Sequence, residues 1–538
     1  MSRRRPCMLF LALVATVPAG SGVGAADAVF QYAGSVTSAQ KQSQAFLWLP
    51  PEAKQVRGVV MAGMTLAERE LVKDPQIRKA CADEQLAIVF LKTGLASVEV
   101  QKVLDDLAGR FGCRELAVAP VFFAGHSAGG PQAKAAAVKH RARCFGVLQY
   151  RGGHPGGDEP VPPGVPALMM LGQFDEFGLK LRDDAGRENW ENGRDSLAAF
   201  RAQNAGNLGC IVIEPGAGHF PWSDRSAAYF ALFLRKAVRA RIPDWPIDAK
   251  TPVVCKETDP AAGWLAELPS RTPGHKPAPF AAYKGDRANA GWHFDRALAE
   301  ATAAYHQGLV GKKDQFLRWT DPHSVEAGAR RYFNDVKWVG DGQTFEVHPV
   351  YAETYPKSSK DGKTPHWVQA GQHVGSAKVP VKVRPVGGPV VAAGANTFRI
   401  KYDALAPAAD PGRIVFLASS EGDAEHRYSE LVGMMPRGFT GLTSGKDQTI
   451  TFPPVPNLQV GTGPVELKAA SDSGLPVEYH VGYGPAVVEN GTLRIAELPA
   501  RASFPIEVKV VAYQFGSGIE PRVKTAAPVE RTLRIEKP

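Results

Sequence analysis

A chain of 538 residues is too long for one ordinary hydrophobic core, so two to four domains are expected. Hydrophobic residues make up 44% of the chain and charged residues 22%, which is typical of soluble globular proteins. The formal charge of +9 comes from scattered basic residues without a Lys/Arg run that is interleaved with aromatic residues, which argues against nucleic-acid binding.

The N-terminus has the pattern of a signal peptide. Residues 3–5 are arginines, residues 8–17 are apolar, and small residues follow at 22–26. The apolar run falls short of the roughly 20 residues needed to span a bilayer, and no later segment is long and apolar enough to do so. We therefore expect residues 1–26 to be removed and the mature protein, with a formal charge of +6, to be secreted or periplasmic without a membrane span.

Residues 27–248 alternate short apolar strands with helical stretches. The predicted strands are Val29–Ala33, Ala45–Leu49, Gly58–Ala62, Ala87–Leu91, Val121–Ala124, Phe145–Tyr150, Ala167–Leu171 and Cys210–Ile213. The predicted helices are residues 98–111, 128–140, 188–203 and 226–240. The later strands are continuous apolar runs, as expected where a strand is buried on both faces. The alternation predicts an α/β domain with a mostly parallel, eight-stranded sheet.

A nucleophile motif follows the fifth predicted strand. The segment Val121–Gly130 reads VFFAGHSAGG and contains G-x-S-x-G with Ser127 at its centre. A sharp strand-to-helix turn of this kind holds a serine oxygen out of the chain, and its tightness requires small residues two positions to either side. Because a strand precedes the motif and an Ala-rich helix follows, Ser127 is the predicted nucleophile. The alternative is a Gly-rich turn with a bystander serine.

Partners for Ser127 follow in the order Ser, acid, His. Asp175 comes directly after the strand of ALMMLGQFDEF, and His219 lies in the loop beyond the last strand, CIVIEPGAGHF. In such a triad His219 takes the proton from the serine and returns it to the leaving group, while Asp175 holds the imidazole and stabilises its charged form.

Three residues offer alternative readings of this site. Glu176 could be the orienting acid in place of Asp175. His154, in YRGGHPGG, is the rival base, but it follows an earlier strand and not the last one. His126, inside the motif, is predicted to be a packing or supporting residue of the turn instead of reacting.

An oxyanion hole needs two backbone N–H groups aimed at the developing negative charge. Ala128, which follows the nucleophile, is predicted to supply one. The other is expected from the loop after the third strand, VVMAGMTLAERE, at Gly63 or Met64. Met64 is the preferred of the two.

These residues together resemble the α/β-hydrolase superfamily over residues 28–240. The short separation of Ser127 and Asp175 leaves little room for a large lid, and in this respect the chain is similar to compact secreted esterases of the dienelactone-hydrolase, acetylxylan-esterase and feruloyl-esterase kind. The family often has H-G-G in the oxyanion loop, where this chain has A-G-M at 62–64. The departure affects which donor is used, since the donors are backbone groups.

The second half of the chain has a different residue pattern. Residues 249–345 are mixed, with one predicted helix at 295–308, and residues 346–445 and 446–538 are each predicted to form a β-sandwich. The last segment carries TITFPPVP, LKAASDSGLPVEYHV, GPAVVENGTLRI and VVAYQFG, which resemble bacterial immunoglobulin-like repeats. Such modules are usually spacers or binding domains. Trp338 and Trp367 are candidate carbohydrate platforms or, alternatively, core residues.

Five cysteines remain after the predicted signal peptide, all before residue 256: Cys81, Cys113, Cys144, Cys210 and Cys255. Export predicts disulfide bonds in this region, with at least one thiol left over. No Cys/His spacing indicates a metal site, and nothing in the sequence implies a cofactor.

The sequence therefore predicts a secreted serine carboxylic-ester hydrolase. The expected substrate is an ester, with acylated polysaccharide or aryl esters as the first candidates because sandwich domains often accompany enzymes that attack polysaccharides. A serine peptidase or amidase on the same fold is one alternative. A carbohydrate- or surface-binding protein with an inactive hydrolase domain is another. The oligomeric state stays open.

Overall fold

The computed structural model describes most of the chain after the predicted signal peptide. The described residues are 29–37, 42–63, 66–173, 175, 189–220, 222–272, 274–320, 324–325, 332–333, 336–354, 373–435 and 440–537. Four of the sequence predictions therefore lie outside the described residues: the leader 1–26, Met64, Glu176 and Trp367.

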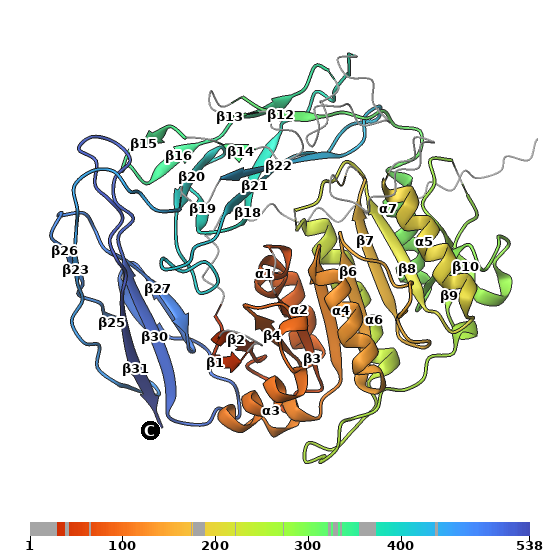
Figure 1. Cartoon of the computed structure of the whole chain (residues 1–538), viewed down its shortest axis with the longest axis horizontal. Coiled ribbons are helices and arrows are strands. Elements are labelled where there is room, and N and C mark those ends of the chain that lie inside the picture. Colours follow the sequence, from red (N-terminus) through yellow and green to blue (C-terminus); the bar gives the residue numbers. More distant parts are fainter. Residues whose placement is uncertain are drawn as a thin grey trace, which may run out of the picture.

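An eight-stranded sheet forms the core of the first half, in the order β1-β2-β4-β3-β5-β6-β7-β8 (Figure 1). Its strands are β1 (Tyr32–Thr37), β2 (Gln42–Trp48), β3 (Gly58–Gly63), β4 (Leu86–Leu91), β5 (Val121–His126), β6 (Cys144–Tyr150), β7 (Ala167–Gly172) and β8 (Gly209–Glu214). β3 to β8 are mutually parallel, whereas β1 and β2 pair antiparallel at one edge. The predicted mostly parallel, eight-stranded sheet is confirmed, and the domain has the α/β-hydrolase fold.

Helices cover both faces of this sheet. They are α1 (Leu66–Lys73), α2 (Pro75–Asp83), α3 (Val100–Phe111), α4 (Gly129–Lys139), α5 (Asn189–Gln203) and α6 (Asp224–Arg241). Apolar side chains of α3, α4 and α5 join the core cluster on one face, and those of α1, α2 and α6 join the cluster on the other. Every residue of β3 to β8 is buried, because helices lie over both sides of these strands.

Residues 264–307 extend the first domain. They form β9 (Trp264–Glu267), β10 (Ala278–Pro279), β11 (Ala290–His293) and α7 (Arg296–Gln307), which agrees with the helix predicted at 295–308. This unit packs against β8 and α6, where the hydroxyls of Tyr229 and Thr302 are hydrogen-bonded at 2.6 Å. The segment is thus part of the first domain's packing.

The second half is built from small, mainly antiparallel sheets, as predicted. The middle sheets contain β12 (Leu317–Trp319), β13 (Ser324–Val325), β14 (Tyr332–Phe333), β15 (Trp338–Val339), β16 (Thr344–Glu346), β17 (Pro349–Tyr351), β18 (Lys382–Gly387), β19 (Val390–Ala392), β20 (Thr397–Ile400), β21 (Ile414–Ser420) and β22 (Ser429–Met435). The expected boundary at 345/346 falls inside β16, which pairs with β15 and β20.

The last 90 or so residues form further sheets, with β24-β31-β30-β27 the largest. Their strands are β23 (Ile450–Thr451), β24 (Leu458–Gln459), β25 (Val465–Glu466), β26 (Ala470–Ser471), β27 (Glu478–Tyr483), β28 (Ala486–Glu489), β29 (Thr492–Ile495), β30 (Ile506–Tyr513) and β31 (Val529–Glu536). The immunoglobulin-like character of this segment stays a prediction.

Both β-rich parts lie directly against the first domain (Figure 1). In the middle part, Asp403 pairs with Lys73 of α1 at 3.1 Å. In the C-terminal part, Arg501 pairs with Glu115, and the N–H of Gly484 donates to the carbonyl of Phe30 at 2.8 Å. The chain therefore folds back on itself, so the C-terminal sheets contact the first domain.

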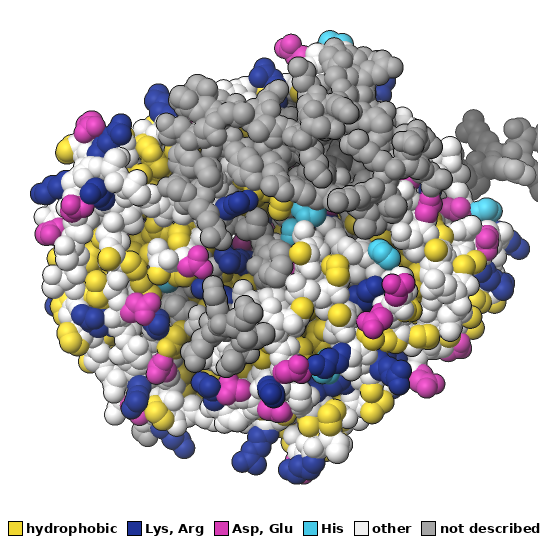
Figure 2. Space-filling view, in the orientation of Figure 1, with side chains coloured by type: hydrophobic (Ala, Val, Ile, Leu, Met, Phe, Trp, Pro, Cys, Tyr) yellow, Lys and Arg dark blue, Asp and Glu magenta, His cyan; other side chains and the backbone are white. Residues whose placement is uncertain are grey.

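Basic and acidic side chains are interspersed over the face drawn in Figure 2. Across the described ranges, no helix combines the length and the apolar character that crossing a bilayer requires.

The predicted disulfide bonds are wrong for the five described cysteines, which are all buried free thiols. Cys113 and Cys144 pack in the cluster on one face of the sheet, while Cys81, Cys210 and Cys255 pack in the cluster on the other. These thiols fill apolar core positions, as free cysteines commonly do.

Three buried histidines are expected to make the protein less stable in acid. Burial lowers the pKa of His293 to about 3 and those of His306 and His480 to about 4. Because histidines of the unfolded chain titrate near 6.5, the unfolded state takes up these protons first, and stability is lost as the pH falls from about 6.5 towards 4. The three protons together contribute up to roughly 4 kcal/mol per pH unit to this loss.

Urea unfolding at pH 7.5, 6 and 5 measures this loss as a falling midpoint. His480→Gln should lower the slope by up to about 1.4 kcal/mol per pH unit, which is the contribution of one proton. The same change at the exposed His373 should leave the slope as it is. A midpoint that does not move between pH 7.5 and 5 would contradict the prediction.

Candidate active site

Ser127 occupies a strained turn between β5 and α4. Its φ is +53°, a left-handed conformation that side-chain-bearing residues seldom adopt. The N–H of Ser127 donates to the carbonyl of Tyr150 at 3.0 Å, and its own carbonyl accepts from Gly130 at 3.0 Å. The turn thus has the geometry that the G-x-S-x-G pattern predicts.

Glycine is required at positions around the turn because neighbouring backbone atoms leave no space for a side chain. A Cβ on Gly125 would lie 2.0 Å from the carbonyl oxygen of Gly129, and one on Gly152 would lie 2.3 Å from that of Ser127. These neighbours are backbone atoms, which cannot rotate aside. Close backbone approach therefore explains the small residues on both sides of the serine.

Gly152→Ala is expected to destabilise the protein by about 1–3 kcal/mol and to lower activity, because the new methyl group pushes on the backbone of the serine. Thermal unfolding and ester turnover measure the two effects. Gly109→Ala is the matched control, since nothing lies within 4 Å of a Cβ there and Gly109 sits inside α3. That variant should gain about 0.5–1 kcal/mol and keep full activity. Equal behaviour of the two variants would be the contrary result.

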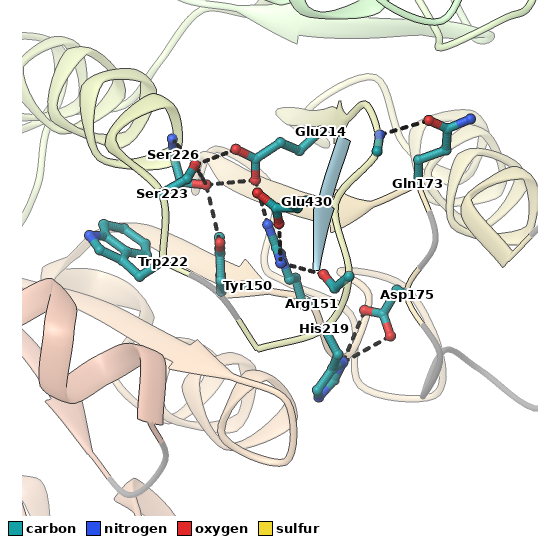
Figure 3. Close-up of polar contacts among 12 residues, drawn as sticks. Tyr150, Arg151, Gln173, Asp175, Glu214, His219, Trp222, Ser223, Ser226 and Glu430 are labelled. Atoms are coloured by element: carbon teal, nitrogen blue, oxygen red, sulfur yellow. Dashed lines mark hydrogen bonds and ion pairs between the residues drawn. The ribbon is translucent and has the colours of Figure 1, made fainter. Parts of the chain in front are cut away.

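The predicted acid and base meet beyond the ends of β7 and β8 (Figure 3). The Nδ1 atom of His219 lies 2.9 Å from Oδ1 and 3.0 Å from Oδ2 of Asp175. Both residues are buried, with 3% and 6% of their surfaces exposed. With its Nδ1 proton donated to the carboxylate, a neutral His219 carries its lone pair on Nε2, as a general base requires.

His126 connects the serine turn to the loop of His219. Its Nε2–H donates to the carbonyl of His219 at 2.9 Å, and the two rings lie 5.0 Å apart between centroids. Burial and the neighbouring His219 hold the pKa of His126 well below its usual range, so the ring is neutral. The backbone N–H of His126 donates to Glu68 at 2.7 Å. The ring therefore packs beneath the turn, in keeping with its expected supporting place.

Ser127 and His219 form no direct hydrogen bond in this structure, although both are described. Catalytic hydrogen bonds often close only in a complex with substrate. The rival base His154 contacts neither Asp175 nor Ser127 among the described residues; it lies beside Gly156 and Gly157. The described geometry thus groups His219, not His154, with Asp175.

The two described oxyanion candidates lie at one edge of the sheet. Ala128 is exposed at the start of α4, and its N–H donates to no group in the described part of the chain. Gly63 ends β3, the parallel neighbour of β5. The amide of Ala128 is therefore available to an incoming anion at the positive end of a helix.

Sequence reasoning missed a buried charge cluster beside His219. Arg151, directly after β6, bonds the carboxylate of Glu214 and the carbonyl of Gly218, and its Nη1 lies 3.5 Å from Glu430 of β22. Charged residues where apolar buried strands end were the available signal, since Arg151 directly follows β6 and Glu214 is the last residue of β8. Nothing local pointed to Glu430.

Glu68 was also missed. Its side chain is 1% exposed and accepts the N–H of His126 directly before the nucleophile. It sits in α1, a helix that the sequence pattern did not indicate.

Metal ligation finds no support in the described ranges, where no group of three or more His, Cys, Asp and Glu side chains is arranged to hold an ion.

No family model matches this sequence, and no curated protein matches it. Solved structures similar to it include an α/β serine hydrolase homologue from Coxiella burnetii, at 14% identity over 38% of this chain and 96% of that one, with a TM-score of 0.27. A poly(3-hydroxybutyrate) depolymerase from Bordetella parapertussis matches at 15% identity over 40% and 92% of the two chains, with a TM-score of 0.27. A fungal esterase from Rhizomucor miehei matches at 14% identity over 40% and 85%, with a TM-score of 0.29. At these scores, the reaction has to be argued from the site of this chain.

Proposed function

We propose that the protein is a serine hydrolase that cleaves carboxylic esters through an acyl-enzyme intermediate. Ser127 Oγ attacks the ester carbonyl while His219 Nε2 takes its proton, and the carbonyl oxygen becomes an oxyanion. The intermediate collapses when the alcohol leaves with the proton held by His219. Water then attacks the acyl-serine by the same route, releasing the acid and restoring the serine.

One observation carries the proposal: the contact of Asp175 with Nδ1 of His219 in a buried place beside the strained serine turn. A buried carboxylate in this position stabilises the imidazolium that forms when the serine gives up its proton. The oxyanion would be held by the N–H of Ala128 together with that of Met64 or Gly63.

Acylated polysaccharide and aryl esters are the proposed substrates, and the secreted or periplasmic compartment is the proposed location. The leader-like residues 1–26 support export, and the appended β-sheets suit an enzyme of extracellular polymers. The resemblance to dienelactone-hydrolase and acetylxylan- or feruloyl-esterase types belongs to the same proposal.

An ester panel tests the proposal. Mature protein is assayed with aryl esters of increasing acyl length, with feruloyl and acetyl sugar esters, and with matching peptide amides. A fluorophosphonate probe reports the reactive serine, and mass spectrometry locates the label. We expect turnover of esters and labelling at Ser127. Cleavage of amides alone would replace the esterase by an amidase, and neither turnover nor labelling would refute a hydrolase.

A further inference from the structure

The loop that carries His219 is held by the middle β-sheets at several points along its length. The N–H of Glu430 donates to the carbonyl of Gly216 at 3.1 Å. Three residues after His219, the carbonyl of Trp222 accepts from Nη2 of Arg384 in β18 at 2.8 Å. Phe220 packs against an apolar cluster formed by Val386, Val415, Leu417, Val432 and Met434. Contacts from the second half of the chain therefore bracket the predicted base.

At Gly216 the backbone of the middle β-sheets lies too close to the histidine loop for any side chain to fit. Its φ is +72°, and a Cβ there would lie 2.1 Å from the carbonyl oxygen of Tyr428. The start of β22 thus presses directly on the backbone of the histidine loop. The position of the histidine loop therefore depends on the position of β22.

A buried charge links this contact to the residue next to His219 (Figure 3). The Arg151 side chain is fully buried, and it bonds the carbonyl of Gly218, the residue directly before His219. Its charge is balanced by Glu214 and, from 279 residues away in sequence, by Glu430, whose side chain is also fully buried. A desolvated guanidinium needs such partners, because losing one leaves an uncompensated buried charge.

A second arginine, Arg225, lies next to this charge cluster. Arg225 lies between the rings of Tyr305 and Tyr428, at 4.9 and 4.8 Å from their centroids. The hydroxyl of Tyr428 donates to Oε2 of Glu430 at 2.8 Å. Arg151, Glu214 and Glu430 are thus buried together where three parts of the chain meet, with the half-buried Arg225 next to them.

We infer that Glu430 is a positioning residue for the reaction proposed above, which sets His219 against Ser127 by holding Arg151 on the carbonyl of Gly218. The inference rests on the proposed function. Without the carboxylate charge, Arg151 turns to Glu214 alone, and the backbone before His219 loses its fixed donor. The β-sheets of the second half then act as a working part of the active site.

Titration of Glu430 gives this role a signature. Burial and the facing Glu214 raise the pKa of Glu430 to about 7, against the lowering effects of Arg151, the Tyr428 hydroxyl and Arg225. The ring of Tyr150 also faces the cluster. Because Glu430 must be ionised to hold Arg151, protonation near neutral pH switches the positioning off. Activity at acid pH then needs an ionised Glu430 in addition to the free Nε2 lone pair that general-base catalysis requires.

Glu430→Gln tests the inference, since it keeps the shape of the side chain and removes the charge. We expect kcat for an aryl ester at pH 8 to fall on the order of 10- to 100-fold while KM changes less than about threefold. The acid limb of log kcat/KM should have a slope approaching two in the wild type and one in the variant. Glu421→Gln, an exposed glutamate of the same domain, should match the wild type in both measurements.

Wild-type kcat and a wild-type acid limb in Glu430→Gln would overturn the inference. If that variant does not fold, the wild-type limb decides alone, and a slope of one overturns it. A wild type that neither turns over esters nor reacts with fluorophosphonate refutes the proposed function instead. The two failures are thus separate results.

Discussion

Ser127→Ala is expected to abolish ester turnover, with kcat lower by a factor on the order of 10⁴ or more. The substitution removes the proposed nucleophilic oxygen, while the turn and its hydrogen bonds to Tyr150 and Gly130 involve backbone groups and stay in place. Alanine tolerates the φ of +53° no better than serine does, so the melting temperature should be unchanged. The readouts are aryl-ester turnover, fluorophosphonate labelling and thermal unfolding.

Ser35→Ala, at an exposed position of β1, is the matched control and should keep both turnover and labelling. Ser127→Gly adds a second check. It also lacks the nucleophile, but it relieves the left-handed backbone and should be the more stable of the two inactive variants. Retention of a tenth or more of the activity in Ser127→Ala would assign the nucleophile elsewhere.

Asp175→Asn is expected to lower kcat by roughly 10³- to 10⁴-fold with little change in KM. The amide is nearly the same shape as the carboxylate, but it carries no charge to stabilise the imidazolium and can favour the wrong tautomer of His219. The loss should be in the chemical step, so single-turnover acylation falls with kcat. Asp244→Asn, at a fully exposed aspartate, should be indistinguishable from the wild type.

Glu176→Gln separates the two candidate acids. If Asp175 is the orienting acid, as its contact with Nδ1 of His219 favours, Glu176→Gln keeps most of the activity. A reversed pattern, in which Asp175→Asn is active and Glu176→Gln is not, would move the role to Glu176.

Much of the first domain was readable from local pattern. Helices cover both faces of the sheet, so every residue of a strand such as Leu86–Leu91 is buried and apolar. Such unbroken apolar runs can be recognised in the sequence. The serine turn was readable because backbone crowding demands glycine at Gly125, while the Glu68 carboxylate leaves no room for a side chain at Gly129. Helices α1 and α2 escaped prediction because they are short and are separated only by Asp74, before a proline at the first position of α2.

Contacts between residues that are far apart in the sequence could not be predicted from local patterns. The cysteines gave a wrong expectation, because their number and an export signal say nothing about which thiols come together. The mixed pattern of residues 249–345 also did not predict which part of the chain they contact. Residues 264–307 pack on β8 and α6, and the contacts next to His219 come mainly from β18 and β22, further along the chain.

Local residue patterns thus predict the reaction chemistry from a serine on a tight turn, followed by an acid and a histidine at the ends of later strands. They do not reveal what holds the histidine. Arg151 and Glu430 are 279 residues apart, and a buried ion pair depends on which charges the fold brings within a few ångströms of each other in the absence of water. Which charges pair is decided by how one domain packs on the other, because no residue periodicity along the chain encodes such a contact.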